Sequence, residues 1–86
     1  MNVHQVEIIK DDNSFKGTWY KKGSRHFVTR NHDNVFLCGW HAIDLCGGID
    51  EQDGVEITSF VARIKCFAVW LQVKLGAREC WAHGGV

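Results

Sequence analysis

The stretch that decides the fold class spans residues 25–40 and reads Arg25-His26-Phe27-Val28-Thr29-Arg30-Asn31-His32-Asp33-Asn34-Val35-Phe36-Leu37-Cys38-Gly39-Trp40. In its first part, Phe27 and Thr29 alternate with their neighbours along the chain, as in a strand. Residues 31–34 predict a tight turn, because Asn and Asp tolerate left-handed backbone and hydrogen-bond their own main chain. Residues 35–40 resume as a strand, so the stretch predicts a β-hairpin.

Further strands are expected on both sides of this hairpin. Residues 3–9 alternate, with Val6 and Ile8 apolar against Gln5 and Glu7 polar. Residues 10–14 form a polar cluster that predicts a turn. Residues 49–53 lie between glycines and predict a second turn, followed by a short strand over residues 55–58.

The last third of the chain predicts a helix over residues 59–76. Thr58 or Ser59 can cap its start and Gly76 can close its end. An apolar stripe recurs at helical spacing and is expected to pack on the rest of the domain, comprising Phe60, Ile64, Phe67, Leu71 and Leu75, widened by Val61 and Ala68. A long strand is the competing interpretation, because Val61, Phe67, Val69, Leu71 and Val73 also alternate. Residues 77–86 are expected to be a fraying tail.

Length and composition restrict the class of protein. The chain of 86 residues fits one domain, residues 1–86, and a hydrophobic fraction of 45% excludes intrinsic disorder. Ten Lys and Arg balance ten Asp and Glu, which argues against a uniformly basic nucleic-acid binder or a strongly acidic DNA mimic. The first residues show no signal peptide, and the longest apolar run is too short to span a bilayer. We therefore expect a cytoplasmic protein without membrane partners, whose cysteines are reduced thiols.

Four short segments carry a resemblance to a known family: Val6-Glu7-Ile8-Ile9, Trp19-Tyr20-Lys21-Lys22-Gly23, Phe27-Val28 and Ile49-Asp50-Glu51-Gln52-Asp53. Together they resemble small SH3-like β-barrel proteins of bacteria and their phages, over residues 3–58. The resemblance implies a mainly β (α+β) fold, an SH3-like barrel followed by the C-terminal helix. It also implies a partner-binding module rather than an enzyme, although the strand around Phe27 lacks the usual acidic residues.

The charges are segregated along the chain. Residues 13–30 carry five Lys or Arg and no acid, residues 31–62 carry six acids and no Lys or Arg, and the remainder is basic again. The blocks either form separate faces that steer a partner or intermix when strands pair basic against acidic residues. Sequence alone leaves both arrangements open.

Binding residues are predicted where aromatic and basic residues interleave and where tryptophans are expected to be exposed. The predicted partner-binding residues are Trp19, Tyr20, Lys21, Lys22, Arg25, Arg30, Trp70 and Trp81. The first six also suit single-stranded nucleic acid, because cations follow the backbone while rings stack on bases. In the resembled family the Trp-Tyr pair is largely architectural, which favours a protein partner.

Two Cys-x-x-His pairs suggest a metal site, formed by Cys38, His41, Cys80 and His83. Zinc prefers four tetrahedral Cys and His ligands, and such a site would tie the tail to the hairpin. The alternative is that the cysteines are small buried hydrophobes, in which case no cofactor is needed.

The sequence shows no nucleophile with a base and an orienting group on separate elements, and no phosphate-binding loop, so we do not expect an enzyme. The function expected is a small protein-binding module, in the manner of a phage-encoded inhibitor or adaptor acting on a host defence or replication protein. The alternatives are a single-stranded nucleic-acid binder and a zinc-stabilised interaction module. A homodimer is expected if the stripe over residues 60–75 is too long for one barrel to cover.

Overall fold

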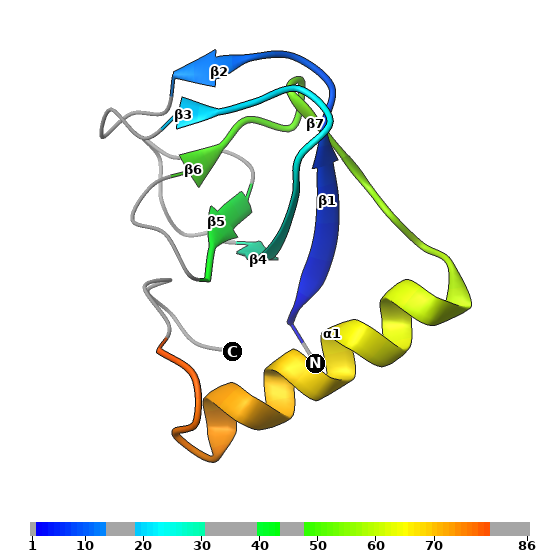
Figure 1. Ribbon diagram of the computed structural model, residues 1–86, viewed down its shortest axis with the longest axis vertical. Coiled ribbons are helices and arrows are strands. Elements are labelled where there is room, and N and C mark those ends of the chain that lie inside the picture. Colours follow the sequence, from blue (N-terminus) through cyan, green and yellow to red (C-terminus); the bar gives the residue numbers. More distant parts are fainter. Residues whose placement is uncertain (1, 14–18, 31–39, 44–47, 80–86) are drawn as a thin grey trace.

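The computed structural model describes residues 2–13, 19–30, 40–43 and 48–79. Along these residues the elements are β1 (His4–Ile8), β2 (Asp12–Asn13), β3 (Trp19–Tyr20), β4 (Arg25–Arg30), β5 (Trp40–Ala42), β6 (Gly48–Ile49), β7 (Gly54–Glu56) and α1 (Phe60–Lys74). The order confirms a small α+β fold in which one C-terminal helix follows the strands (Figure 1).

One antiparallel sheet organises the described residues, in the order β6-β5-β4-β1-β7. As predicted, an antiparallel partner follows β4, but its register differs: a turn over residues 31–34 would place Arg30 opposite Val35, whereas Arg30 pairs with Trp40. The partner strand β5 continues to Ala42, two residues beyond the predicted end of the hairpin. The predicted turn and most of the predicted second strand, residues 31–39, lie outside the described residues.

The first face of the sheet carries a compact apolar cluster. As predicted, Val6 and Ile8 of β1 point into it, because alternate residues of a strand share a face. The other members are Tyr20, Val28, Trp40, Ala42 and Ile49. Tyr20 comes from β3, which pairs with β2. The turn predicted over residues 10–14 is therefore wrong at Asp12–Asn13, which form β2 of a two-stranded ribbon.

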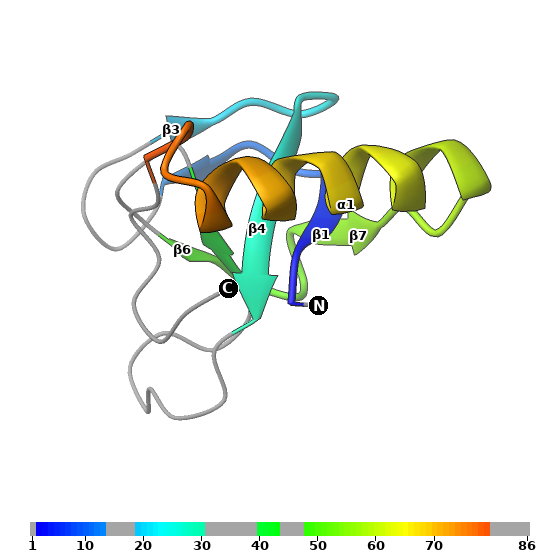
Figure 2. The ribbon, with the colours of Figure 1, turned by 90° about the horizontal axis from the view of Figure 1, so that it is seen from below.

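The helix α1 covers the second face. Val3 and Ile43 from the sheet side meet Cys66 and Val69 of α1, with Phe27, Trp70 and Val73 packed around them. Figure 2 shows α1 lying across β4 and β1. Because this face is covered too, Gln5 is buried although it occupies a polar position of the alternating pattern.

The described strands do not form a closed barrel. The edge strands β6 and β7 share no backbone pairing, so the sheet is open. At Gly54 of β7, a Cβ atom would lie 3.3 Å from Ile49 Cγ2 and 3.5 Å from the Trp40 ring. Side chains of the first core cluster thus lie against the start of β7.

The predicted helix boundaries are confirmed by the two caps of α1. Ser59 is the N-cap, and its hydroxyl accepts a hydrogen bond of 3.2 Å from the Ala62 amide. At the other end Gly76 has a φ of +76°, and its amide donates to the Val73 carbonyl while the Ala77 amide donates to that of Gln72. This paired arrangement is the Schellman motif, which needs a residue that adopts left-handed backbone.

Candidate functional site

The face of α1 that packs on the sheet is not the one that the apolar spacing predicted. Ala62, Cys66 and Val69 are the buried residues of the helix. At about 100° per residue, the predicted stripe lies on the opposite side of the helix. Its members are exposed: Phe60, Ile64, Phe67, Leu71 and Leu75, with fractions of 77, 53, 52, 41 and 75%. We call these five residues the outward face of α1.

The reason for this reversal is that α1 has two apolar faces. The inner face holds small or compact side chains, which let the helix approach the sheet closely, and the half-buried Trp70 and Val73 complete it. The outward face holds the larger side chains, which the narrow sheet leaves uncovered. Both faces have the same helical period, so spacing alone does not distinguish them.

The outward face is large for a chain of this size. Large apolar side chains offer about 150–250 Å² each, so the exposed fractions leave on the order of 500 Å² on this face. Exposed apolar patches of this size mark interaction sites more often than ordinary surface does. Phe67 is held in place by Trp70, whose ring stacks on it with centroids 5.8 Å apart and an interplanar angle of 30°.

Basic side chains surround the outward face. Arg63 and Lys74 lie along one flank of the helix and Lys65 lies along the other. α1 contains no Asp or Glu, so no acid of the helix itself offsets these charges. The arrangement combines an apolar strip with a positive rim, and it favours a ligand that is apolar at its centre and acidic at its edges.

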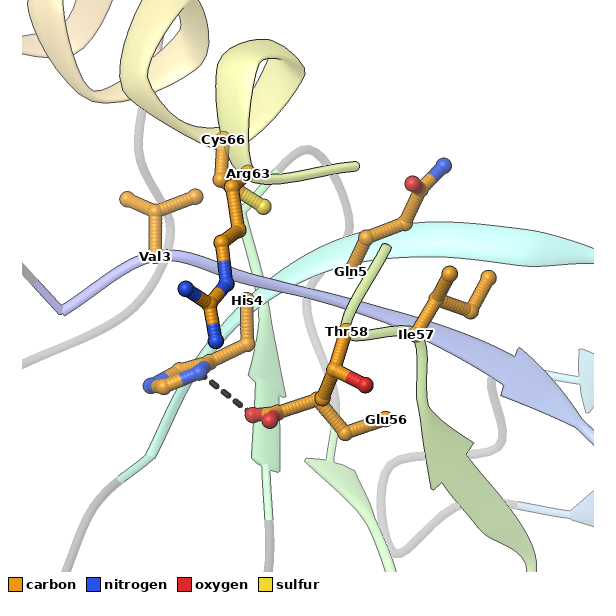
Figure 3. A pocket seen from close by; sticks show the side chains of 8 residues that line it. All are labelled: Val3, His4, Gln5, Glu56, Ile57, Thr58, Arg63 and Cys66. Atoms are coloured by element: carbon orange, nitrogen blue, oxygen red, sulfur yellow. Dashed lines mark ion pairs between the residues drawn. The ribbon is translucent and has the colours of Figure 1, made fainter. Parts of the chain in front are cut away.

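A cavity of about 330 Å³ lies beside the first turns of α1 (Figure 3). Its lining comes from three segments: Val3, His4 and Gln5 of the N-terminal strand region, Glu56, Ile57 and Thr58 at the end of β7, and Arg63 and Cys66 of α1. His4 Nδ1 and Glu56 Oε1 are 2.5 Å apart. Figure 3 shows Arg63 extending from α1 toward this pair.

The Cys66 thiol at this cavity is not an activated nucleophile. Burial raises its pKa, the nearby Glu56 carboxylate raises it further, and the backbone of Gln5 offsets part of this by hydrogen bonding. A thiol with a raised pKa stays protonated near neutral pH, whereas catalysis requires the thiolate. Cys66 therefore serves the packing of α1 on the sheet.

The predicted basic binding residues are divided between free and paired positions. Lys21 and Lys22 are exposed where β3 leads into β4, and the Lys22 amide donates a 2.8 Å hydrogen bond to Asp11. Arg25 pairs with Glu7 at 3.1 Å. Arg30 pairs with Glu51, and its guanidinium lies 5.6 Å from the Trp40 ring centroid.

These ion pairs show whether the basic block, residues 13–30, and the acidic block, residues 31–62, lie apart or intermix. Arg30 belongs to the basic block and Glu51 to the acidic block, so the two blocks intermix at this position rather than forming separate faces. Among the predicted aromatic residues, Tyr20 is only 1% exposed and lies in the core. The Tyr20 ring fills the first core cluster, and the residue also lines a cavity together with Asp11, Lys21 and Lys22.

The three tryptophans predicted to bind a partner differ in their positions. Trp70 is half-buried between the inner core cluster and Phe67, so it supports the outward face rather than standing free on the surface. Trp19 belongs to β3, where its backbone pairs with Asn13. Trp81 lies outside the described residues.

Of the four predicted zinc ligands, only His41 lies among the described residues. His41 lies in β5 and is 5% exposed. Cys38, Cys80 and His83 lie outside the described residues. Within the described part of the chain, no three His, Cys, Asp or Glu side chains are grouped so that they could hold a metal ion. The same part contains no helix of sufficient length and apolarity to cross a membrane.

The chain was compared with protein-family models, with curated proteins and with solved structures, and none of the three comparisons gave a match. The function is therefore inferred from the residues and their geometry. The described residues offer the outward face of α1, the cavity beside it, and a further cavity of about 480 Å³ lined by Asp11, Tyr20, Lys21 and Lys22.

Proposed function

We propose that the chain is a small protein-binding module whose main contact is the outward face of α1. The observation that carries the proposal is the exposure of five large apolar side chains on one side of a helix that is already packed on its other side. The spacing of Phe60, Ile64, Phe67 and Leu71 is that of the anchors by which an amphipathic helix fills an apolar groove. The partner therefore supplies the groove and this chain supplies the helix.

The basic rim favours a partner other than a second copy. In an antiparallel pair of outward faces centred near Phe67, Arg63 of one chain would lie beside Lys74 of the other, because equal flanks meet. Such like charges oppose association, whereas acidic side chains around the groove of a different protein would pair with Arg63, Lys65 and Lys74. A homodimer is the alternative occupant, and the experiment below detects it.

The strand order supports a more specific proposal. An antiparallel order β7-β1-β4-β5-β6, with the β2–β3 ribbon between β1 and β4, is consistent with an SH3-like barrel. The resemblance of residues 3–58 to such proteins of bacteria and phages also supports an SH3-like barrel. On this basis we extend the proposal to an inhibitor or adaptor that binds a bacterial host protein of defence or replication.

The test is a pull-down from a bacterial lysate with three immobilised proteins. The wild type is compared with the Ile64→Ser/Leu71→Ser double variant, which makes the outward face polar, and with Val55→Ser. Val55 is a matched control because it is an exposed apolar residue of β7, 51% exposed, away from α1.

The proposal expects one protein that the wild type and Val55→Ser retain and that the double variant loses. Equal retention by all three, or retention of nothing at low salt, refutes it. Sedimentation of the wild type alone provides the second measurement, because dimerisation abolished by the double variant would identify a second copy as the occupant.

A further inference from the structure

The outer edge of β7 leaves main-chain groups open beside the cavity of Figure 3. In the pairing of β1 with β7, the Ile57 amide donates to the Gln5 carbonyl and the Ile9 amide donates to the Asp53 carbonyl. Hydrogen-bonded and non-hydrogen-bonded pairs alternate along an antiparallel ladder, so Val6–Glu56, which is next to Gln5–Ile57, is of the non-hydrogen-bonded kind. The amide and carbonyl of Glu56 therefore point away from β1, toward the side of β7 on which no described strand pairs.

The edge is accessible at one end of β7 only. Gly54 is buried against Ile49 and Trp40, which blocks an added strand there. Glu56 and Thr58 are exposed, and both line the cavity. An added strand would therefore pair with the last residue of β7 and end over the cavity, so the site suits the end of a peptide rather than its middle.

Arg63 and Glu56 both line this cavity. Among the described residues Arg63 has no ion-pair partner, whereas Glu56 Oε1 lies 2.5 Å from His4 Nδ1. A guanidinium presents its donors in a fixed fork that matches a carboxylate. The group that Arg63 would complement is thus a carboxylate at the end of the added strand.

The floor of the cavity is apolar. Val3, Ile57 and Cys66 contribute to its lining, and the protonated thiol of Cys66 adds no charge. A volume of about 330 Å³ is at the lower limit of natural ligand pockets and accepts one aliphatic side chain together with a carboxylate. Main-chain pairing, a carboxylate contact and an apolar pocket are thereby available at adjacent positions.

We propose that this cavity is a second binding site, which takes the free C-terminus of a protein chain that ends in an aliphatic residue. The terminal carboxylate pairs with Arg63, the last side chain enters the cavity between Val3, Ile57 and Cys66, and the peptide backbone adds to the open edge of β7 at Glu56. The site shares Arg63 with the rim of the outward face of α1, and its other contacts are made by β1, the end of β7 and Cys66, not by the five apolar residues of that face.

The experiment is an NMR titration of the ¹⁵N-labelled chain with four acetylated pentapeptides of sequence Gly-Thr-Val-Thr-X, in which X is Val, Ile, Leu or Phe. Each is used as the free acid and as the C-terminal amide. We expect at least one free acid with an aliphatic X to shift the amide signals of Glu56, Ile57 and Cys66. We expect its amide to bind about tenfold more weakly, since a charge-assisted hydrogen bond is lost.

Two variants complete the test. Arg63→Gln should weaken the free acid about tenfold, to the affinity of the amide, whereas Lys65→Gln, on the other flank of α1, should leave it unchanged. The Ile64→Ser/Leu71→Ser variant should bind the free acid as the wild type does, which separates this site from the outward face. The proposal is overturned if none of the four free acids shifts these signals, if acid and amide bind equally, or if Arg63→Gln has no effect.

Discussion

Val69→Ala and Val61→Ala remove the same two methyl groups from a buried and from an exposed position of one helix. Val69 is 4% exposed and packs with Val3, Ile43 and Cys66. Val61 is 58% exposed and lies within the stripe that the apolar spacing assigned to the core. The pair therefore tests directly which face of α1 is buried.

The expected costs differ by about 2 kcal/mol. Each buried methyl group contributes about 0.8 kcal/mol by transfer from water, and the cavity left by Val69→Ala adds a further penalty. Alanine is the better helix former by about half a kcal/mol, which offsets part of the loss. Val69→Ala should lower the free energy of unfolding by about 2 kcal/mol, whereas Val61→Ala should leave it unchanged or raise it by up to about 0.5 kcal/mol.

Urea unfolding followed by circular dichroism measures both values in the same buffer. For a domain of this length the larger effect corresponds to a fall in Tm of about 8–16 °C. Equal losses for the two variants, or a larger loss for Val61→Ala, would mean that the stripe over residues 60–75 packs inward. That result would remove the outward face of α1 and the function proposed for it.

Three further predictions concern the caps and the buried thiol. Ser59→Ala should lower the free energy of unfolding by about 1 kcal/mol in urea titrations while Ser59→Asp retains it, because only a side-chain acceptor satisfies the Ala62 amide. Gly76→Ala should cost about 1 kcal/mol in the same assay, since no atom lies within 4 Å of the added Cβ and the whole cost is the φ of +76°. The pKa of Cys66 is raised in the folded state, so the unfolded chain releases the thiol proton at a lower pH than the folded protein does. The contribution of the protonated thiol to the free energy of unfolding is therefore complete below the ordinary pKa of 9.0 and is lost as the pH rises above that value. Urea midpoints under reducing conditions should therefore fall between pH 8 and pH 10.5 more steeply for the wild type than for Cys66→Ala, and parallel curves would contradict the assignment.

Local signals in the sequence located β1, β4, β7 and α1, whereas no strand was predicted at β2, β3 or β6. The alternation of Val6 and Ile8 with polar neighbours located β1, and Ser59 and Gly76 located the ends of α1 to within two residues. These signals work because caps and strand alternation depend on groups only a few residues apart. An antiparallel partner for β4 was also predictable from the order of the apolar stretches, but its register was not.

The candidate sites were not predictable in the same way. The cavity brings Gln5 together with Ile57 and Arg63, which lie more than fifty residues further along the chain. Nothing in the residues around Arg63 indicates whether it has an acidic partner, since that depends on His4 engaging Glu56 across the β1–β7 pair. The burial of Tyr20 was not predictable for a similar reason, because β3 carries its ring into a core formed by four other strands.

The sequence by itself determined the α+β class, the antiparallel return after β4 and the extent of α1, since each follows from local periodicity and local hydrogen bonding. Only the tertiary structure decided which face of α1 is buried. Both faces of the helix are apolar, and the sheet selects the one whose compact side chains, Ala62 and Cys66, allow close approach. The larger side chains are left outward within a basic rim, and the surface proposed to bind a partner results from that selection.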